Sequence, residues 1–362
     1  MDYAVIMAGG TGKRLWPLSR KRRPKQVLRL AEGKTLLGSC LDRLRPIFDP
    51  DRILVLTNVD YADQVRRDLP DLRADQVVVE PLVRDTCGAI GLAAAILTRR
   101  DPDATMAVMT ADQVIRPPEV LQRAIQDGLW FVNGRPQCLL TFGVKPTFAS
   151  TQLGYVQLAD PTAFPGCTNA IHPVEAFKEK PDAASAQAFL ASGRTLWNSG
   201  MFVWKAQTIL DSIRRFLPQT RQPLEEIHRA WATPRQEAAV QEWFPKLPKT
   251  SIDFAVMEKA ADVYAIRLDC QWLDVGSFAA LGELIGPDAN HNVIAAKSSE
   301  LLDCKDTIVV TEDDGHLIAA IGMESVIIAH SPDATLVCPV SQAERLKELL
   351  ERLERRGATQ YL

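Results

Sequence analysis

The chain has 362 residues and a formal net charge of −3, with 46% hydrophobic residues. This size gives room for one large domain and a smaller one, and the charge balance excludes a generally basic nucleic-acid-binding chain. The seven cysteines include no C-x-x-C pair, which argues against a disulfide framework or zinc ribbon and suits a reducing cytoplasm. The longest apolar run, Ala89 to Leu97, is too short to span a bilayer, and no leader precedes Asp2. We therefore expect no membrane association and no secretion signal.

The first apolar run, Tyr3–Ala8, predicts a buried strand, and a glycine-rich turn with Gly9, Gly10 and Gly12 follows it. Glycines let backbone N–H groups approach a phosphate closely, and cations neutralise its charge. The cations in and after this turn are Lys13, Arg14, Arg20, Lys21, Arg22, Arg23 and Lys25. Together these features indicate a polyphosphate site, although a hairpin turn beside a solvated basic loop has the same composition.

Two common phosphate-binding motifs can be tested by their spacing. A dinucleotide fingerprint that used Gly10 and Gly12 would need its third glycine at Leu15. A Walker P-loop would need a serine or threonine at Arg14 and a glycine at Met7. Both motifs fail, so the turn does not indicate a dinucleotide-dependent dehydrogenase or a P-loop enzyme.

Beyond the turn, apolar runs alternate with helix-period segments, which predicts a Rossmann-like α/β fold with a mixed, mostly parallel sheet and helices on both faces. The expected strands are 3–8, 52–57, 77–80, 106–110, 138–145, 155–158, 170–178, 201–204 and 263–272. The expected helices are 35–48, 61–69, 85–100, 118–132, 182–192, several within 206–244, and 251–260. Ligands on such sheets bind beyond the carboxyl ends of the strands.

After Pro287 the pattern changes to short strands separated by turns. These strands are expected at 293–296, 307–311, 317–320, 325–329 and 335–339, before a charged helix at 342–356. The pattern predicts a large domain over residues 1–286 and a small β-rich, partial β-helix-like domain over residues 287–362. The small domain and its helix are compatible with a homodimer contact and equally with a packing cap.

The stretch from Met7 to Leu28, with its RLWPLSR and PKQ strings, resembles the N-terminal motif of sugar-1-phosphate nucleotidyltransferases. It is most similar to their mannose-1-phosphate guanylyltransferase branch, and the WNSGMF and DVGS strings support the resemblance. The resemblance runs from about Tyr3 to the C-terminus and implies the nucleotide-diphospho-sugar transferase fold. It also implies an enzyme that makes GDP-mannose and pyrophosphate from GTP and mannose 1-phosphate. Longer relatives add an isomerase domain, which we do not expect here.

The resemblance implies that the turn and the base-reading segment after Val79 form the nucleotide site. Its expected members are Ala8, Gly9, Gly10, Gly12, Lys13, Glu80, Arg84 and Thr86. Arg14 would bind the leaving phosphates and Lys25 the reacting phosphate. The Glu80 carboxylate could accept both N–H donors of the guanine edge. The alternative is a plain strand–loop–helix joint with an N-cap at Asp85-Thr86, where Asp85 replaces the family's usual asparagine.

Two aspartates are expected to hold Mg²⁺ or another divalent cation. Asp112 ends an apolar strand, and Asp274 lies between a strand and a glycine. Mg²⁺ favours one or two carboxylates together with substrate phosphates, and the resemblance assigns both residues to the metal. Each aspartate alone could instead cap a turn or helix. Thr110 and Gln113 stand where the family usually has proline and histidine.

The resemblance also assigns a sugar-phosphate site. Its expected members are Gly154, Glu179, Lys180, Asn198 and Asp253, with Lys180 binding the phosphate and the others near the sugar hydroxyls. Without the resemblance, a charged strand end before Pro181 and a solvated amphipathic helix around Asp253 would explain two of these segments.

Two further interpretations stay open. One is a pyrophosphorylase of the same type with another sugar or base. The other is a catalytically silent homologue that binds a nucleotide-sugar and a partner subunit. A silent homologue is expected to lose phosphate cations or metal carboxylates, whereas this chain keeps Arg14, Lys25, Asp112, Lys180 and Asp274.

Overall fold

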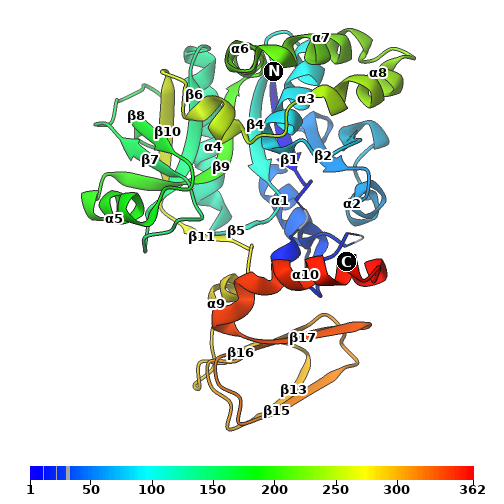
Figure 1. Ribbon diagram of the computed structural model, residues 1–362. Coiled ribbons are helices and arrows are strands. Elements are labelled where there is room, and N and C mark those ends of the chain that lie inside the picture. Colours follow the sequence, from blue (N-terminus) through cyan, green and yellow to red (C-terminus); the bar gives the residue numbers. More distant parts are fainter. Residues whose placement is uncertain (11, 22, 30–32) are drawn as a thin grey trace.

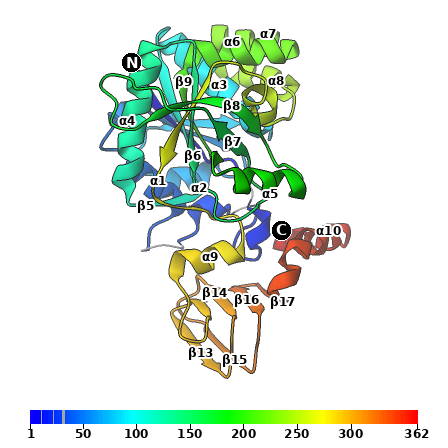
Figure 2. The same ribbon diagram turned by 90° about the vertical axis from the view of Figure 1, so that its left-hand side faces the viewer.

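The computed structural model describes residues 1–10, 12–21, 23–29 and 33–362. Figures 1 and 2 show a large α/β part and, beneath it, a smaller part made mainly of β-strands. The predicted fold class is therefore confirmed: a mixed sheet is flanked by helices, and a β-rich segment follows it.

The central sheet carries the large part. Its strands are β1 (Asp2–Met7), β2 (Ile53–Asn58), β3 (Val77–Glu80), β4 (Thr105–Thr110), β6 (Leu139–Val144), β7 (Tyr155–Leu158), β8 (Ile171–Lys178), β9 (Thr195–Lys205) and β10 (Val263–Leu268). They lie in the order β3-β2-β1-β4-β9-β6-β10-β8-β7. β3, β2, β1 and β4 are parallel, whereas β9 runs antiparallel between β4 and β6. The chain winds in opposite directions from β1, so the loops after β1 and β4 border one crevice.

Helices cover both faces of this sheet (Figure 1). They are α1 (Leu36–Leu44), α2 (Ala62–Asp68), α3 (Asp85–Arg100), α4 (Pro118–Gly134), α5 (Ala183–Ser192), α6 (Ala206–Phe216), α7 (Arg221–Ala230) and α8 (Gln236–Trp243). Alternate residues of β1 point to opposite faces. Ala4 and Ile6 pack in the core with α1, α2 and α4, while Tyr3 and Val5 pack in the core with α3, α6, α7 and α8.

A short ladder outside the main sheet differs from the prediction. The single strand expected at 263–272 is two strands, because the chain bends at Cys270 and leaves the sheet after β10. The second strand, β11 (Gln271–Asp274), pairs antiparallel with β5 (Gln113–Arg116), a strand that was not predicted. β5 has only two apolar residues between polar ends, too few to show a strand pattern.

The C-terminal part begins with α9 (Phe278–Ile285) and continues into two small sheets. One contains β12 (Val293–Ala295), β14 (Ile308–Thr311), β16 (Val326–Ser331) and β17 (Ala334–Pro339), and the other contains β13 (Ser298–Leu302) and β15 (Leu317–Ile321). β12, β14 and β16 stack in parallel, as expected of a partial β-helix. The expected C-terminal helix begins as a 3₁₀ segment, Val340–Arg345, and continues as α10 (Leu346–Arg355).

Candidate active site

The glycine turn lies at the carboxyl end of β1 and is shaped by contacts that exclude larger residues. Gly12 has a φ of +60°, and a Cβ there would lie 2.7 Å from the Cβ of Lys25. The Gln26 side chain donates to the carbonyl of Gly10 at 3.0 Å. Both contacts join the turn to the segment that carries Lys25, so the predicted phosphate-binding turn and its lysine form one unit.

Lys25 connects the two aspartates that were predicted as metal ligands. Its Nζ lies 2.7 Å from Oδ2 of Asp112 and 3.7 Å from Oδ1 of Asp274, and it donates to the Val275 carbonyl at 3.3 Å. Burial by itself lowers the pKa of Lys25, but attraction to both carboxylates outweighs it and leaves the pKa raised. Burial also raises the pKa of Asp274, with partial compensation from Lys25. Lys25 is therefore a buried cation held between two carboxylates.

Arg14 lies on the open side of this cluster. A Cβ built on Gly276 would meet its Nη2 at 3.0 Å and Oδ2 of Asp274 at 3.5 Å. The glycine in the DVGS string thus leaves room for the guanidinium beside the carboxylate. Lys13 and Arg14 are both exposed, so their charges are accessible to an anionic ligand.

The β5–β11 ladder brings the two aspartates together. Gln113 pairs with Asp274 in this ladder, and the Val275 amide donates to the Asp112 carbonyl at 3.3 Å. The Gln113 side chain donates to the Ser199 carbonyl at 2.6 Å and accepts from Trp272 Nε1 at 3.0 Å. Gln113 therefore fixes the packing of this ladder against β9, which gives a structural role to a residue that departs from the family pattern.

The two carboxylates fit a divalent cation. They converge on one ammonium, and Mg²⁺ commonly takes one or two protein carboxylates and completes its shell with substrate phosphates and water. No group of three or more His, Cys, Asp or Glu side chains that could hold an ion exists within the described ranges. Two carboxylates are within the number that Mg²⁺ takes from a protein, and phosphate and water oxygens would have to complete its shell.

Glu80 lies at the end of β3, next to the glycine turn. Its Oε1 would be 3.8 Å from a Cβ on Gly9, and its side chain is buried. Burial, reinforced by the nearby charge of Asp85, raises the pKa of Glu80 to about 7. The structure thus places a buried carboxylate beside the turn, and the selection of a base by Glu80 stays a prediction.

Arg84 and Thr86 lie at the start of α3, where the side chains of both form hydrogen bonds to the backbone of the segment before β10. Arg84 donates to the Pro245 carbonyl, and Thr86 Oγ1 accepts from the Ile252 amide at 2.8 Å. The helix cap is Arg84 and not the expected Asp85-Thr86 pair, although Oδ1 of Asp85 accepts from the Thr86 amide at 2.8 Å. Nucleotide contacts by Arg84 and Thr86 stay predictions, and these bonds leave fewer donors and acceptors for them.

The predicted sugar-site residues form a second cluster around β7, β8 and β9. A Cβ on Gly154 would lie 2.5 Å from Oε2 of Glu179, and Oε1 of Glu179 is 2.9 Å from Lys180 Nζ. Asn198 donates to Oδ1 of Asp253 at 2.9 Å. Burial and the nearby charge of Glu179 raise the pKa of Asp253 to about 7. The structure thus brings all five residues together as a polar, partly buried set.

Glu258 belongs to this cluster, although its sequence context indicated no role for it. Its Oε1 accepts from the Glu179 amide at 2.9 Å and lies 3.5 Å from Lys178 Nζ. The alternative of a solvated amphipathic helix is wrong: Asp253–Met257 is a π-helix with a mostly buried sequence. The π-helical bond from the Glu258 amide to the Asp253 carbonyl stacks these two residues. An α-helix joins residues four apart, so an α-helical pattern does not indicate that Asp253 and Glu258, five residues apart, are hydrogen-bonded.

The cations after the glycine turn do not all face the site. Arg20 binds Asp333, Arg23 pairs with Glu312, and Lys21 lies 3.9 Å from Glu354 in α10. Arg22 lies outside the described residues. The predicted cationic rim is therefore divided: Lys13, Arg14 and Lys25 are available to the site, while the other described cations contact the C-terminal part.

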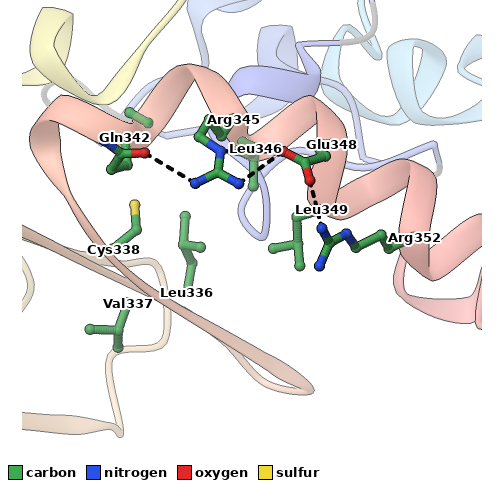
Figure 3. A pocket seen from close by; sticks show the side chains of 10 residues that line it. Leu336, Val337, Cys338, Gln342, Arg345, Leu346, Glu348, Leu349 and Arg352 are labelled. Carbon is green, nitrogen blue, oxygen red and sulfur yellow. Dashed lines mark hydrogen bonds and ion pairs between the residues drawn. The ribbon is translucent and has the colours of Figure 1, made fainter.

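A pocket of about 230 Å³ lies between β17 and the C-terminal helix, and no predicted site residue lines it. In Figure 3, Arg345, Glu348 and Arg352 form a hydrogen-bonded chain above the apolar side chains of Leu336 and Leu349.

No helix in the part of the chain that the structure describes is long and apolar enough to cross a membrane.

Comparison with known proteins relates this architecture to two families. The chain matches the Nucleotidyl transferase family model over residues 3–290. It matches the MannoseP isomerase/GMP-like beta-helix domain over residues 300–353. The first match includes every predicted site residue, and the second covers most of the stacked β-strands.

Individual relatives extend over the whole chain. A mannose-1-phosphate guanylyltransferase of Klebsiella pneumoniae is 34% identical over 366 residues, which cover 100% of this chain and 76% of that protein. The xanthan biosynthesis protein XanB of Xanthomonas campestris is 34% identical, with 98% and 74% covered. The crystal structure of mannose-1-phosphate geranyltransferase from Thermus thermophilus aligns with a TM-score of 0.86 at 33% identity, covering 98% of this chain and 99% of that chain.

Proposed function

The chain belongs to the nucleotidyl transferase family, and we propose that it makes GDP-mannose and pyrophosphate from GTP and mannose 1-phosphate. The observation that carries this proposal is the Lys25, Asp112 and Asp274 cluster beside the glycine turn. It supplies a cation and two carboxylates at the point where the crevice of the sheet opens. The polar cluster of Glu179, Lys180, Asn198 and Asp253 supports a sugar-phosphate ligand.

The proposed reaction is a single in-line displacement. A phosphate oxygen of mannose 1-phosphate forms a bond to the α-phosphorus of GTP, and the bond from that phosphorus to the pyrophosphate oxygen breaks. The attacking phosphate needs no general base, because the second pKa of a phosphomonoester is about 6. The barrier is then mainly charge repulsion and misorientation, which positioning and cations can lower.

Each residue of the site would have a separate role in this reaction. Lys25 would stabilise charge at the reacting phosphate, Arg14 would hold the leaving pyrophosphate, and Lys180 would bind the sugar phosphate. Asp112 and Asp274 would hold Mg²⁺, which when bound supplies further neutralisation of the nucleotide phosphates. The backbone of Ala8, Gly9, Gly10 and Gly12 would wrap the triphosphate, with Lys13 at its edge.

Glu80 would select the base. Guanine presents two adjacent N–H donors, whereas adenine presents a donor beside an acceptor, so a carboxylate favours guanine. The burial of Glu80 next to Gly9 supports this role, because a desolvated acceptor discriminates strongly against a ligand that leaves it unpaired. Gly154, Glu179, Asn198 and Asp253 would contact the sugar hydroxyls.

Three other statements stay predictions. These are a boundary between two domains at residues 286 and 287, a homodimer formed through the C-terminal part, and a cytoplasmic location. None is needed for the chemistry. The reaction class depends only on the crevice residues and their ligands.

The direct test is product identification. The purified chain is incubated with GTP, mannose 1-phosphate and Mg²⁺, and phosphorus NMR and mass spectrometry follow the products. We expect GDP-mannose and pyrophosphate in equal amounts, and none after chelation of the metal. Release of GDP and phosphate without a nucleotide-sugar would contradict the proposal.

A further inference from the structure

The segment from Gly9 to Thr35, called the signature loop below, carries Arg14 and Lys25. Between β1 and α1 its described residues contain two 3₁₀ turns, Lys13–Leu15 and Lys25–Val27, and isolated bridge residues, but no α-helix or longer strand. A loop of this length needs contacts from elsewhere to hold one conformation. The C-terminal part supplies many of them.

The first set of contacts is apolar. Leu15, Trp16, Leu18 and Leu28 of the signature loop are buried in one core cluster with side chains from the C-terminal strands and α10. The partners from β14, β16, β17 and α10 include Ile308, Val310, Ile327, Leu336, Leu346 and Leu350. Figure 1 shows the red C-terminal helix beside the dark blue N-terminal loop. Burial places the loop against the C-terminal part but does not by itself fix the direction of its cations.

The second set is polar and directional. Arg20 Nη1 donates to Oδ2 of Asp333 at 2.6 Å, and Nη2 donates to Oδ1 at 2.5 Å and to Ser331 Oγ at 2.6 Å. Arg20 Nε donates within the loop to the Pro17 carbonyl at 3.0 Å. Such a two-pronged pair fixes geometry as well as charge. Arg20 therefore has most of its donors engaged by protein acceptors and is poorly placed to bind a phosphate.

A second carboxylate holds the loop farther along. Oε2 of Glu312, which follows β14, lies 2.5 Å from Arg23 Nη2. Its Oε1 accepts from the Arg29 amide at 2.9 Å. Arg20 and Arg23 are joined by a short antiparallel bridge. These contacts bracket Lys25, whose own Nζ points to Asp112.

We propose that Arg20, Asp333 and Glu312 are positioning residues, and that the C-terminal β-rich part serves the transfer reaction by orienting the signature loop. The inference rests on the proposed function, because it assigns Arg14 and Lys25 of that loop to the phosphates of GTP. A displacement of about 1 Å in a catalytic group can lower a rate by up to about 100-fold. Loss of the Arg20–Asp333 pair should therefore slow GTP turnover, although Arg20 directs its guanidinium to Asp333 and Ser331 and is given no substrate contact.

The test uses Asp333→Asn and Arg20→Met in the full chain, with Asp314→Asn as control. Asp314 also belongs to the C-terminal part, but its ion pair is with Lys297 and does not involve the loop. We expect each of the first two variants to lower kcat/KM for GTP about tenfold, while the KM for mannose 1-phosphate and the number of GTP sites per chain stay unchanged. The control should behave as wild type.

The double variant separates positioning from other roles. If Arg20 and Asp333 act as one unit, combining the changes should lower kcat/KM no further than either change alone. Wild-type kinetics in Asp333→Asn beside an impaired Arg20→Met would overturn the inference, because Arg20 would then act on the substrate directly. A fall in GTP sites that accounts for the lost activity would also overturn it. An inactive wild-type enzyme would instead count against the proposed function.

Discussion

Lys25, which is buried, and Asp112, which is partly exposed, form an ion pair of 2.7 Å between the signature loop and the end of β4. Asp274 lies 3.7 Å from the same ammonium. This pair joins the glycine turn after β1 to the carboxylates at the ends of β4 and β11, so the two predicted phosphate-handling features are one site. Lys25 and Asp112 each give a separate prediction.

Replacing Lys25 by methionine should lower kcat by about 100- to 1,000-fold, the usual effect of removing one charge-stabilising donor from an active site. Steady-state pyrophosphate release measures the change. Lys34→Met is the matched control, because Lys34 is exposed and pairs with Asp42 in α1. If Lys25→Met retains more than about half of the wild-type kcat, Lys25 does not act on the reacting phosphate.

Asp112→Asn should nearly abolish turnover with Mg²⁺ while the chain stays folded. The amide keeps the shape of the side chain but lacks the charge that a hard cation needs. Activity is measured across a Mg²⁺ titration, with circular dichroism to check folding. Full activity at ordinary Mg²⁺ concentrations would rule out Asp112 as a metal ligand.

Glu80→Gln should stabilise the free protein at about pH 8 and weaken its use of GTP. Burial and Asp85 raise the Glu80 pKa from 4.5 to about 7, so the folded state binds a proton more tightly than the unfolded state. The stabilisation due to that proton is present below the ordinary pKa and is lost as pH rises through about 7. This loss lowers the free energy of unfolding by at most about 3 kcal/mol. Urea unfolding at about pH 5 and about pH 8 measures the free energy of unfolding, which should fall less between these two pH values in the variant than in wild type.

The same variant tests base selection. kcat/KM for GTP should fall about 10- to 100-fold, while kcat/KM for ATP changes much less, because glutamine cannot accept both N–H groups of guanine. In wild type, kcat/KM for GTP should rise as pH passes about 7 and Glu80 ionises. An unaltered preference for GTP over ATP in Glu80→Gln would show that another residue selects the base.

Lys180→Gln should raise the KM for mannose 1-phosphate about 10- to 100-fold and leave the KM for GTP unchanged. The loss corresponds to one charge-assisted hydrogen bond of about 1.5–3 kcal/mol. Lys178→Gln is the control, since Lys178 is on the same strand end but pairs with Glu258. Equal effects of the two substitutions would indicate a general charge effect instead of a specific phosphate contact.

The sequence predicted those parts of the fold that local patterns determine. The bounds of β3 and α3 match the expected 77–80 and 85–100, because a run of valines favours a strand and a long stretch rich in alanine and other apolar residues favours a buried helix. The glycine turn was also predictable, because Gly9, Gly10 and Gly12 follow an apolar run, and their spacing excluded a dinucleotide fingerprint and a Walker P-loop. Resemblance, and not periodicity, supplied the roles of Glu179 and Asn198.

The rest depends on contacts between distant residues. Arg20 and Asp333 are separated by 313 positions, and nothing near either residue indicates the other. The β5–β11 ladder is short and polar at its ends, so its pairing is visible only in three dimensions. Arg20 was therefore predicted as a phosphate cation, whereas the structure pairs its guanidinium with Asp333.

The central claim is most directly tested by measuring kcat/KM for pyrophosphate release with Mg²⁺ across a grid of nucleoside triphosphates and hexose 1-phosphates. We predict the highest value for GTP with mannose 1-phosphate, by at least about tenfold over any other pair, because two N–H donors of guanine meet one buried carboxylate. A maximum with another base or sugar would contradict the assignment of Glu80 or the sugar cluster. No release with any pair, from folded protein that binds GTP, would contradict the claim that this site is catalytic.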